Sequence, residues 1–234
     1  MKKNALVLIC FLCATTNVYA DEMRDEDVAF LVTDAQACRH ADARRAALNH
    51  LMKSIDYDTN RFVRVVGRML GDETKRIGLL SILQRYGNKS ALPIFYKHLS
   101  DSNCLYYAAW GVLAHEGLTS NSVMKISEQI QRFKDTQSAY NAFGVMMNYA
   151  SKEKDLNIRR LAVNEGIAYA TKNQDCTEIV DKLLMEADET YRLSKRRLNV
   201  LRSVKAIGLT KWNKEFVEKV IKELEAFPEE KLPE

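Results

Sequence analysis

Four histidines are the side chains of this sequence best suited to acid–base catalysis or metal binding near neutral pH. They are His40, His50, His98 and His115. Beyond residue 20 the sequence contains no HExxH, CxxC or CxxCH pattern, the spacings that usually mark zinc or haem sites. His98 and His115 each lie near the predicted end of a helix, where an imidazole can contact backbone carbonyls and the negative end of the dipole. We therefore expect no metal, no cofactor and no catalytic histidine.

Patterns for covalent catalysis are also lacking. The sequence has no GxSxG elbow and no glycine-rich phosphate loop. Its acidic pairs, such as Asp25 with Asp27 and Glu229 with Glu230, lie in the terminal segments, and we interpret them as solvated charge. Carboxylates brought together from distant helices, as in glycosidases, stay open as an alternative. The sequence favours a non-catalytic protein, with a helical envelope enzyme as the second hypothesis.

A group of aromatic residues is the main candidate for binding a partner. Its members are Tyr106, Tyr107, Trp110, Tyr140, Phe143 and Tyr149. Tyrosine and tryptophan combine rigid apolar area with a polar tip, which protein interfaces favour. Trp110 and Phe143 each follow a tyrosine by three residues, and we expect both inside. For the four tyrosines, a partner-binding surface and a core between helices both stay open.

The basic run 195–197, flanked by Arg192 and Arg202, is a second candidate surface. Acidic residues such as Glu186 and Asp188 lie close by in the sequence. A run of this kind usually forms one solvated helix face, and that is our interpretation.

The first twenty residues have the three parts of a signal peptide. Lys2 and Lys3 are followed by an apolar run over residues 5–14 and by Val18-Tyr19-Ala20, which has the small-x-small shape of a cleavage site. The run is shorter than the roughly 20 residues that a membrane-spanning helix needs. We expect cleavage after Ala20 and a free protein in the periplasm or outside the cell, with no membrane anchor.

Cleavage would lower the formal net charge from +4 to +2, because the segment carries two lysines and no acid. A nearly neutral chain is not drawn to nucleic acid. Three cysteines would remain, Cys38, Cys104 and Cys176. An odd, widely spaced set does not indicate a disulfide framework, so we expect small buried side chains; a single disulfide among them stays open.

The chain is predicted to be all-α, because apolar residues recur at helical spacing and no segment alternates as a strand does. The predicted helices cover residues 26–37, 41–55, 59–70, 73–86, 90–99, 103–116, 120–134, 137–151, 156–172, 175–187, 190–207 and 211–226. Gly87, Gly117 and Gly208 are expected to end helices in left-handed turns. Asp72 and Asp101 lie near helix starts, where a carboxylate accepts backbone N–H groups.

Internal similarity indicates how these helices are arranged. Helices that begin at a basic or aromatic residue can be aligned on Arg45, Arg76, Tyr107, Tyr140, Arg160 and Arg197, at spacings of 31, 31, 33, 20 and 37 residues. A period near 30 is typical of helix pairs stacked in one dimension. An irregular helical bundle is the alternative.

Residues 70–101 resemble a HEAT-repeat unit of the short bacterial type that is also found in phycobilin-lyase-like proteins. The likeness rests on Asp72, Arg76, the stop at Gly87 and the entry at Pro93, and it covers residues 41–135 well and the rest loosely. It implies a right-handed α-α superhelix, a HEAT-like α-solenoid of about five to six helix pairs. We expect one such domain over residues 21–227 and a flexible acidic tail over 228–234.

In HEAT-like repeats an aspartate and an arginine form a ladder along the stack. The resemblance implies this structural role for Asp42/Arg45, Asp72/Arg76 and Asp155/Arg160. A planar guanidinium can satisfy carboxylate and helix-end acceptors together. A basic stripe that binds a ligand is the alternative.

A solenoid exposes a long curved surface and suits extended protein partners. We expect an exported, non-catalytic scaffold that binds another protein through its concave face, at Tyr106, Tyr107, Tyr140 and Tyr149. A dedicated inhibitor or immunity-type binder of one cognate protein is a narrower form of this hypothesis. A lyase-like chromophore handler rests on the family resemblance alone, and export argues against it.

Overall fold

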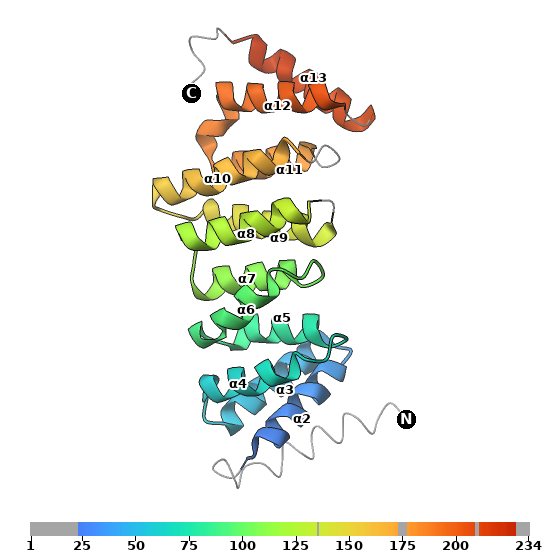
Figure 1. Cartoon of the computed structure of the whole chain (residues 1–234), viewed down its shortest axis with the longest axis vertical. Helices are drawn as coiled ribbons and strands as arrows, with labels where there is room; N and C mark the ends of the chain where they lie inside the picture. Colours follow the sequence, from blue (N-terminus) through green and yellow to red (C-terminus); the bar gives the residue numbers. More distant parts are fainter. Residues whose placement is uncertain (1–22, 135, 173–176, 209–210, 228–234) are drawn as a thin grey trace. The chain divides into compact units, whose positions relative to one another are not determined.

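The computed structural model describes residues 23–134, 136–172, 177–208 and 211–227 (Figure 1). Within these ranges the chain forms twelve α-helices and no strand, so the all-α prediction is confirmed. The predicted signal peptide, the predicted acidic tail and Cys176 lie outside the described residues.

The helices follow one another with short connections. Their bounds are α2 (Asp25–Ala37), α3 (Ala41–Ser54), α4 (Thr59–Met69), α5 (Arg76–Tyr86), α6 (Leu92–His98), α7 (Leu105–His115), α8 (Ser120–Arg132), α9 (Gln137–Ala150), α10 (Leu156–Ala170), α11 (Thr177–Ala187), α12 (Lys195–Ile207) and α13 (Lys211–Glu225). Two 3-10 turns, η3 (Lys89–Ala91) and η5 (Glu189–Leu193), precede α6 and α12.

All twelve predicted helices are present, and the largest difference is at 190–207. There the chain forms η5 first, and α12 begins only at Lys195. Ser194 causes the break: its backbone is extended, and its hydroxyl accepts the N–H of Arg197 as an N-cap.

Two of the three glycines that were predicted to end helices have a left-handed backbone conformation. Gly117 and Gly208 have φ of 86° and 109°, values that favour glycine. Gly87 differs, because its backbone is extended with φ of −77°. A Cβ at Gly87 would collide with the carbonyl oxygen of Leu83. Glycine is therefore required there by the close approach of this backbone oxygen and not by a left-handed backbone conformation.

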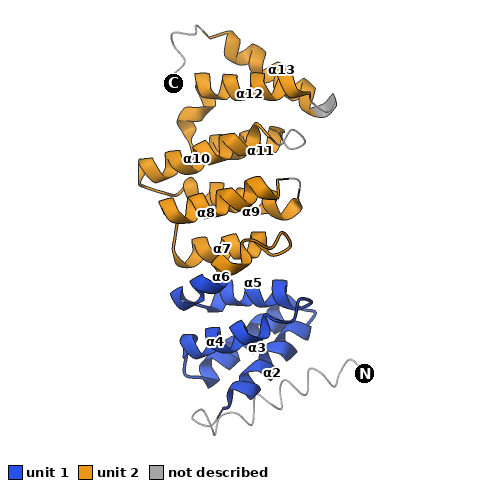
Figure 2. Ribbon diagram, in the orientation of Figure 1, with its two compact units in different colours: residues 1–94 blue, residues 95–234 orange. Residues whose placement is uncertain are grey.

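The chain divides into two compact units, residues 1–94 and 95–234, and the division falls within α6 (Figure 2). The single repeat domain over residues 21–227 stays a prediction.

Unit 1 holds the N-terminal end of α2 against α4. Asp25 accepts from Arg61 at 2.9 Å and lies 3.8 Å from Arg64 and 3.3 Å from Arg68. The three arginines share one face of α4 because they are three and four residues apart. The hydrogen bond from Arg61 is the main reason that the pKa of Asp25 is lowered. Asp25 is therefore an ion-pair centre, and its interpretation as solvated charge was wrong.

Unit 2 packs its helices serially. α7 lies against α9 and α9 against α11, while α8 lies against α10 and α10 against α12. The interior of the unit contains large apolar side chains such as Phe95, Phe143 and Tyr169, all with no exposed surface. Gly111 of α7 packs directly against the ring of Phe95. Consecutive helices of unit 2 thus bury their apolar faces on near neighbours in the sequence.

A buried ion pair joins α11 to α12. Nε and Nη2 of Arg197 donate to the Asp181 carboxylate at 3.1 and 2.6 Å, and Nη1 donates to the carbonyl of Arg192 at 2.9 Å. Only 9% of the Arg197 side chain and 3% of the Asp181 side chain are exposed. Burial raises the pKa of Asp181, and the guanidinium opposes that rise. The interpretation of the whole basic run as a solvated face is wrong for Arg197.

Gly111→Ala should destabilise the protein, because the new Cβ would overlap the Phe95 ring. Overpacking of this kind costs about 1–3 kcal/mol. Gly144→Ala is the matched control on another helix, since its Cβ would meet only a Leu183 methyl group at 4.0 Å. Alanine should there raise the free energy of unfolding by about 0.5–1 kcal/mol. Chemical denaturation measures both, and equal effects would contradict the packing of α7 on Phe95.

Arg197→Ala should lower the free energy of unfolding by about 3–5 kcal/mol, because it leaves the Asp181 carboxylate buried without its cation. Arg202→Ala is the control, since Arg202 pairs with Glu225 at 2.7 Å but both side chains are about half exposed. Loss of that pair should cost less than about 1 kcal/mol. Similar losses for the two variants would show that the Asp181–Arg197 pair is not the buried pair described here.

Candidate functional site

A groove with a volume of about 910 Å³ opens on unit 2. Its described lining comes from α7, α9 and α11 and from the residues directly after α9. α7 contributes Tyr106 and Trp110, and α11 contributes Ile179 and Leu183. Each of these pairs is four residues apart, which places both members on one face of their helix.

α9 supplies the middle of the lining, because it packs against both α7 and α11. Tyr140, Gly144 and Asn148 recur every four residues along it, and Tyr149 follows. Gly144 keeps the groove open at this point: no side chain fills the space, and the nearest atom to a hypothetical Cβ is a Leu183 methyl carbon at 4.0 Å.

The aromatic side chains of the groove contact one another. The ring centroids of Tyr106 and Trp110 are 5.6 Å apart, and the backbone N–H of Tyr106 donates to Ser138 Oγ of α9 at 3.0 Å. Trp110 hydrogen-bonds to the Tyr149 side chain, which partly opposes the burial that raises the pKa of Tyr149. Burial also raises the pKa of Tyr106, and Tyr107 adds to the rise. Both phenols are therefore neutral near pH 7 and can donate or accept hydrogen bonds.

The polar groups of the groove suit binding more than reaction chemistry. Lys152 is the one charged side chain in its described lining, and its Nζ lies 2.7 Å from Asn148 Oδ1. No carboxylate, imidazole or thiol belongs to that described lining. The groove can hold apolar or aromatic groups and hydrogen-bond to neutral polar ones.

The structure brings three of the four predicted tyrosines together. Tyr106, Tyr140 and Tyr149 are half-buried and line the groove. Tyr107 is also half-buried and packs edge-on to Tyr106, with centroids 4.7 Å apart, but it does not line the groove. Trp110, expected inside, is half-buried and belongs to the lining.

Sequence reasoning missed the contribution of α11. Ile179 and Leu183 fit the apolar pattern of a helix face that turns inward, and nothing in the sequence separates them from core residues. In the structure Ile179 is half exposed, whereas Phe143, which was also expected inside, is fully buried. Only the placement of α11 beside α9 reveals that two apolar residues remain at the surface.

The predicted ladder begins with two exposed aspartates of unit 1. Asp42 pairs with Arg45 at 2.6 Å within α3. Asp72 pairs with Lys75 at 3.2 Å, and its carboxylate also accepts the N–H of Thr74 at 3.0 Å. Both contacts are local to one turn of chain.

Two of the remaining ladder residues, Arg76 and Asp155, also have local contacts. Arg76 lies 3.4 Å from Glu73 and donates to the carbonyl of Leu70. Asp155 is the N-cap of α10 and accepts the N–H of Asn157 at 2.8 Å, while Arg160 is exposed. The role of these pairs as a ladder between repeats stays a prediction.

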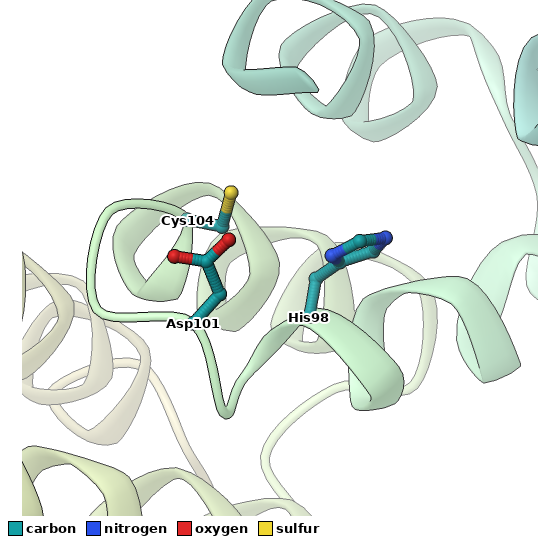
Figure 3. A group of neighbouring side chains, drawn as sticks. All are labelled: His98, Asp101 and Cys104. Carbon is teal, nitrogen blue, oxygen red and sulfur yellow. The ribbon is translucent and has the colours of Figure 1, made fainter. Parts of the chain in front are cut away.

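His98 and His115 are the last residues of α6 and α7, the helix-end positions that the sequence predicted for them. His115 stacks on the ring of Phe95 with centroids 5.7 Å apart. His98, Asp101 and Cys104 come together at the corner between α6 and α7 (Figure 3). Their ligand atoms lie within 4.8 Å of one another, so this is a set of described residues that could hold a metal ion. The signal in the sequence is the unfamiliar spacing H-x-x-D-x-x-C.

Comparison with known proteins gives no match to any family model, curated protein or solved structure. Among the described residues, no helix has both the length and the apolar character needed to cross a bilayer.

Trp110→Phe should raise the pKa of Tyr149 further. The change keeps an aromatic ring but removes the indole N–H, whose hydrogen bond lowers that pKa. Loss of a donor to the phenolate destabilises the charged form, so Tyr149 should ionise at higher pH. NMR titration of ring-labelled tyrosine measures this, with Tyr86 of unit 1 as the internal control. An unchanged Tyr149 midpoint would contradict the contact.

Proposed function

We propose that this chain is a non-catalytic scaffold that binds a segment of another protein in the groove of α7, α9 and α11. One observation carries the proposal: three serially packed helices leave half-buried Tyr106, Trp110, Tyr140 and Tyr149 on a single concave surface. Aromatic side chains that are fixed by their neighbours and still reachable are the usual anchors of protein interfaces.

The groove chemistry defines the bound segment. Apolar or aromatic side chains would occupy the space over Gly144 and beside Leu183. The amides of Asn141 and Asn148 and the tyrosine hydroxyls would hydrogen-bond to the backbone of the segment. Lys152 adds one positive charge, which favours a neutral or mildly acidic segment over a basic one.

We further propose that the helices form the HEAT-like, right-handed solenoid of about five to six helix pairs that the sequence period implies. The support comes from unit 2, where alternate helices pack on one another in chain order and the groove residues belong to one alternate set, α7, α9 and α11. Serial packing of this kind is the expected contact pattern of stacked helix pairs.

Export is part of the proposal and rests on residues 1–20 alone. The partner would then be a protein of the cell envelope or of the surroundings. In the inhibitor or immunity-type form of the proposal, the chain binds a single cognate protein very tightly. The second class is an envelope enzyme; the described groove lining, which holds no carboxylate, imidazole or thiol, gives it less support than partner binding.

The test compares partner capture from envelope extract by the wild type and by Tyr140→Ala/Tyr149→Ala. Removing two anchor side chains should reduce recovery of any groove-bound protein by at least about ten-fold, since single hot-spot residues contribute 2 kcal/mol or more. Phe30→Ala is the matched control, because Phe30 is an exposed aromatic residue of α2 in unit 1.

A direct measurement follows with the purified captured protein. In a Trp212→Phe background, Trp110 is the sole tryptophan, so its fluorescence should change on binding. Equal capture by wild type and double variant, or no change in Trp110 fluorescence at saturation, would overturn the groove as the binding surface.

A further inference from the structure

His98, Asp101 and Cys104 are placed by one short, hydrogen-bonded corner of unit 2. The N–H of Asp101 donates to the carbonyl of His98 at 3.3 Å, and the N–H of Cys104 donates to the carbonyl of Asp101 at 3.0 Å. These are two successive turns that meet at Asp101, each closed by one backbone hydrogen bond. The two turns together carry three side chains that bear metal-ligand atoms.

The three side chains converge. In Figure 3 the Asp101 carboxylate lies beside Cys104, and the ring of His98 lies across from both. The backbone N–H of Asn103 donates to Asp101 Oδ1 at 3.0 Å and orients that carboxylate. One imidazole nitrogen, one carboxylate oxygen and one sulfur lie within 4.8 Å of one another.

These separations are close to those of a bound zinc ion. Zn–N and Zn–O distances of about 2.0–2.2 Å and a Zn–S distance of about 2.3 Å place tetrahedral ligand atoms about 3.3–3.8 Å apart. The observed set, whose atoms lie within 4.8 Å of one another, needs to close by about 1.5 Å at most, which side-chain rotations can supply. His98 and Asp101 are partly exposed while Cys104 is buried, so an ion could enter from the His98 and Asp101 side and meet the thiol last.

The kinds of donor decide which ion fits. A thiolate is a soft ligand and an imidazole a borderline one, and this pair selects zinc and similar transition metals over Mg²⁺ and Ca²⁺, which prefer oxygen. The alternative function of these groups is covalent catalysis, in which His98 would activate Cys104 as a nucleophile. Burial argues against it, because Cys104 is 2% exposed and a substrate could not reach its sulfur.

We propose that His98, Asp101 and Cys104 form a binding site for one divalent transition-metal ion, zinc above all, with the fourth position open to water or to a ligand from a partner. The ion would fasten the end of α6 to the start of α7, since Cys104 immediately precedes Leu105. The site does not depend on the groove for its ligands. It changes our expectation from the sequence, which assigned no metal.

The test uses the purified protein with every cysteine except Cys104 replaced by serine. Zn²⁺ binding is measured by competition with a chromophoric chelator under reducing conditions, and Co²⁺ is added separately as a spectroscopic probe. We expect one ion per chain and, with Co²⁺, a thiolate-to-metal charge-transfer band together with the intense visible bands of tetrahedral cobalt. That band requires a coordinated thiolate, and in this variant Cys104 carries the only thiol.

Three variants separate binding from folding. Cys104→Ser should abolish the charge-transfer band. Asp101→Asn keeps the side-chain oxygen that accepts the N–H of Asn103 but removes the charge, so the corner should fold while Zn²⁺ affinity falls. His98→Gln should weaken binding likewise. Each loss should be at least roughly 100-fold, because even outer-shell partners contribute 10- to 100-fold to metal affinity.

His50→Gln, outside the cluster, is the control and should bind zinc like the parent protein. Circular dichroism verifies that each variant is folded. Failure of the folded parent to bind a stoichiometric ion would overturn the proposal. So would a parent complex without a thiolate band, or Zn²⁺ affinity that Asp101→Asn and His98→Gln leave unchanged. Partner capture is measured separately, so loss of the metal site would leave the groove hypothesis standing.

Discussion

The structure depends on one constraint, which is that helices of seven to fifteen residues are not stable alone in water and must bury a face on a neighbour. In unit 2 helices close in the sequence meet this need, since α9 packs against both α7 and α11. Close approach requires small residues at the contacts: a Cβ at Gly111 would overlap the Phe95 ring, and one at Gly166 would crowd a Leu184 methyl group.

Serial packing also explains why a groove exists. A helix that buries one face against two neighbours leaves its remaining residues at the edge of the core, and there tyrosine and tryptophan can be half-buried with their polar atoms reachable. Tyr106, Tyr140 and Tyr149 occupy this position, whereas Phe143 lies on the inward side of the same helix as Tyr140. The candidate binding surface is thus a consequence of how α7, α9 and α11 pack.

The fold supplies partners to the buried charged pair of unit 2. Arg197 and Asp181 tolerate burial because two guanidinium nitrogens meet two carboxylate oxygens and the third reaches a carbonyl. At the α6–α7 corner, backbone turns collect His98, Asp101 and Cys104 into one group. The first arrangement fastens two helices, and the second offers a place where an ion could do the same.

The sequence alone determined the helices, because apolar spacing and the capping preferences of glycine, serine and aspartate act within a few residues. It also singled out three of the tyrosines that line the groove. Tertiary structure decided the rest. Asp181 lies sixteen positions before Arg197, so a local charge pattern made the arginine look solvated, and Ile179 became a groove residue only through the packing of α11 on α9. The sequence spacing alone did not reveal the cluster of His98, Asp101 and Cys104. The distances between these side chains depend on the path of the backbone between them, which only the structure shows.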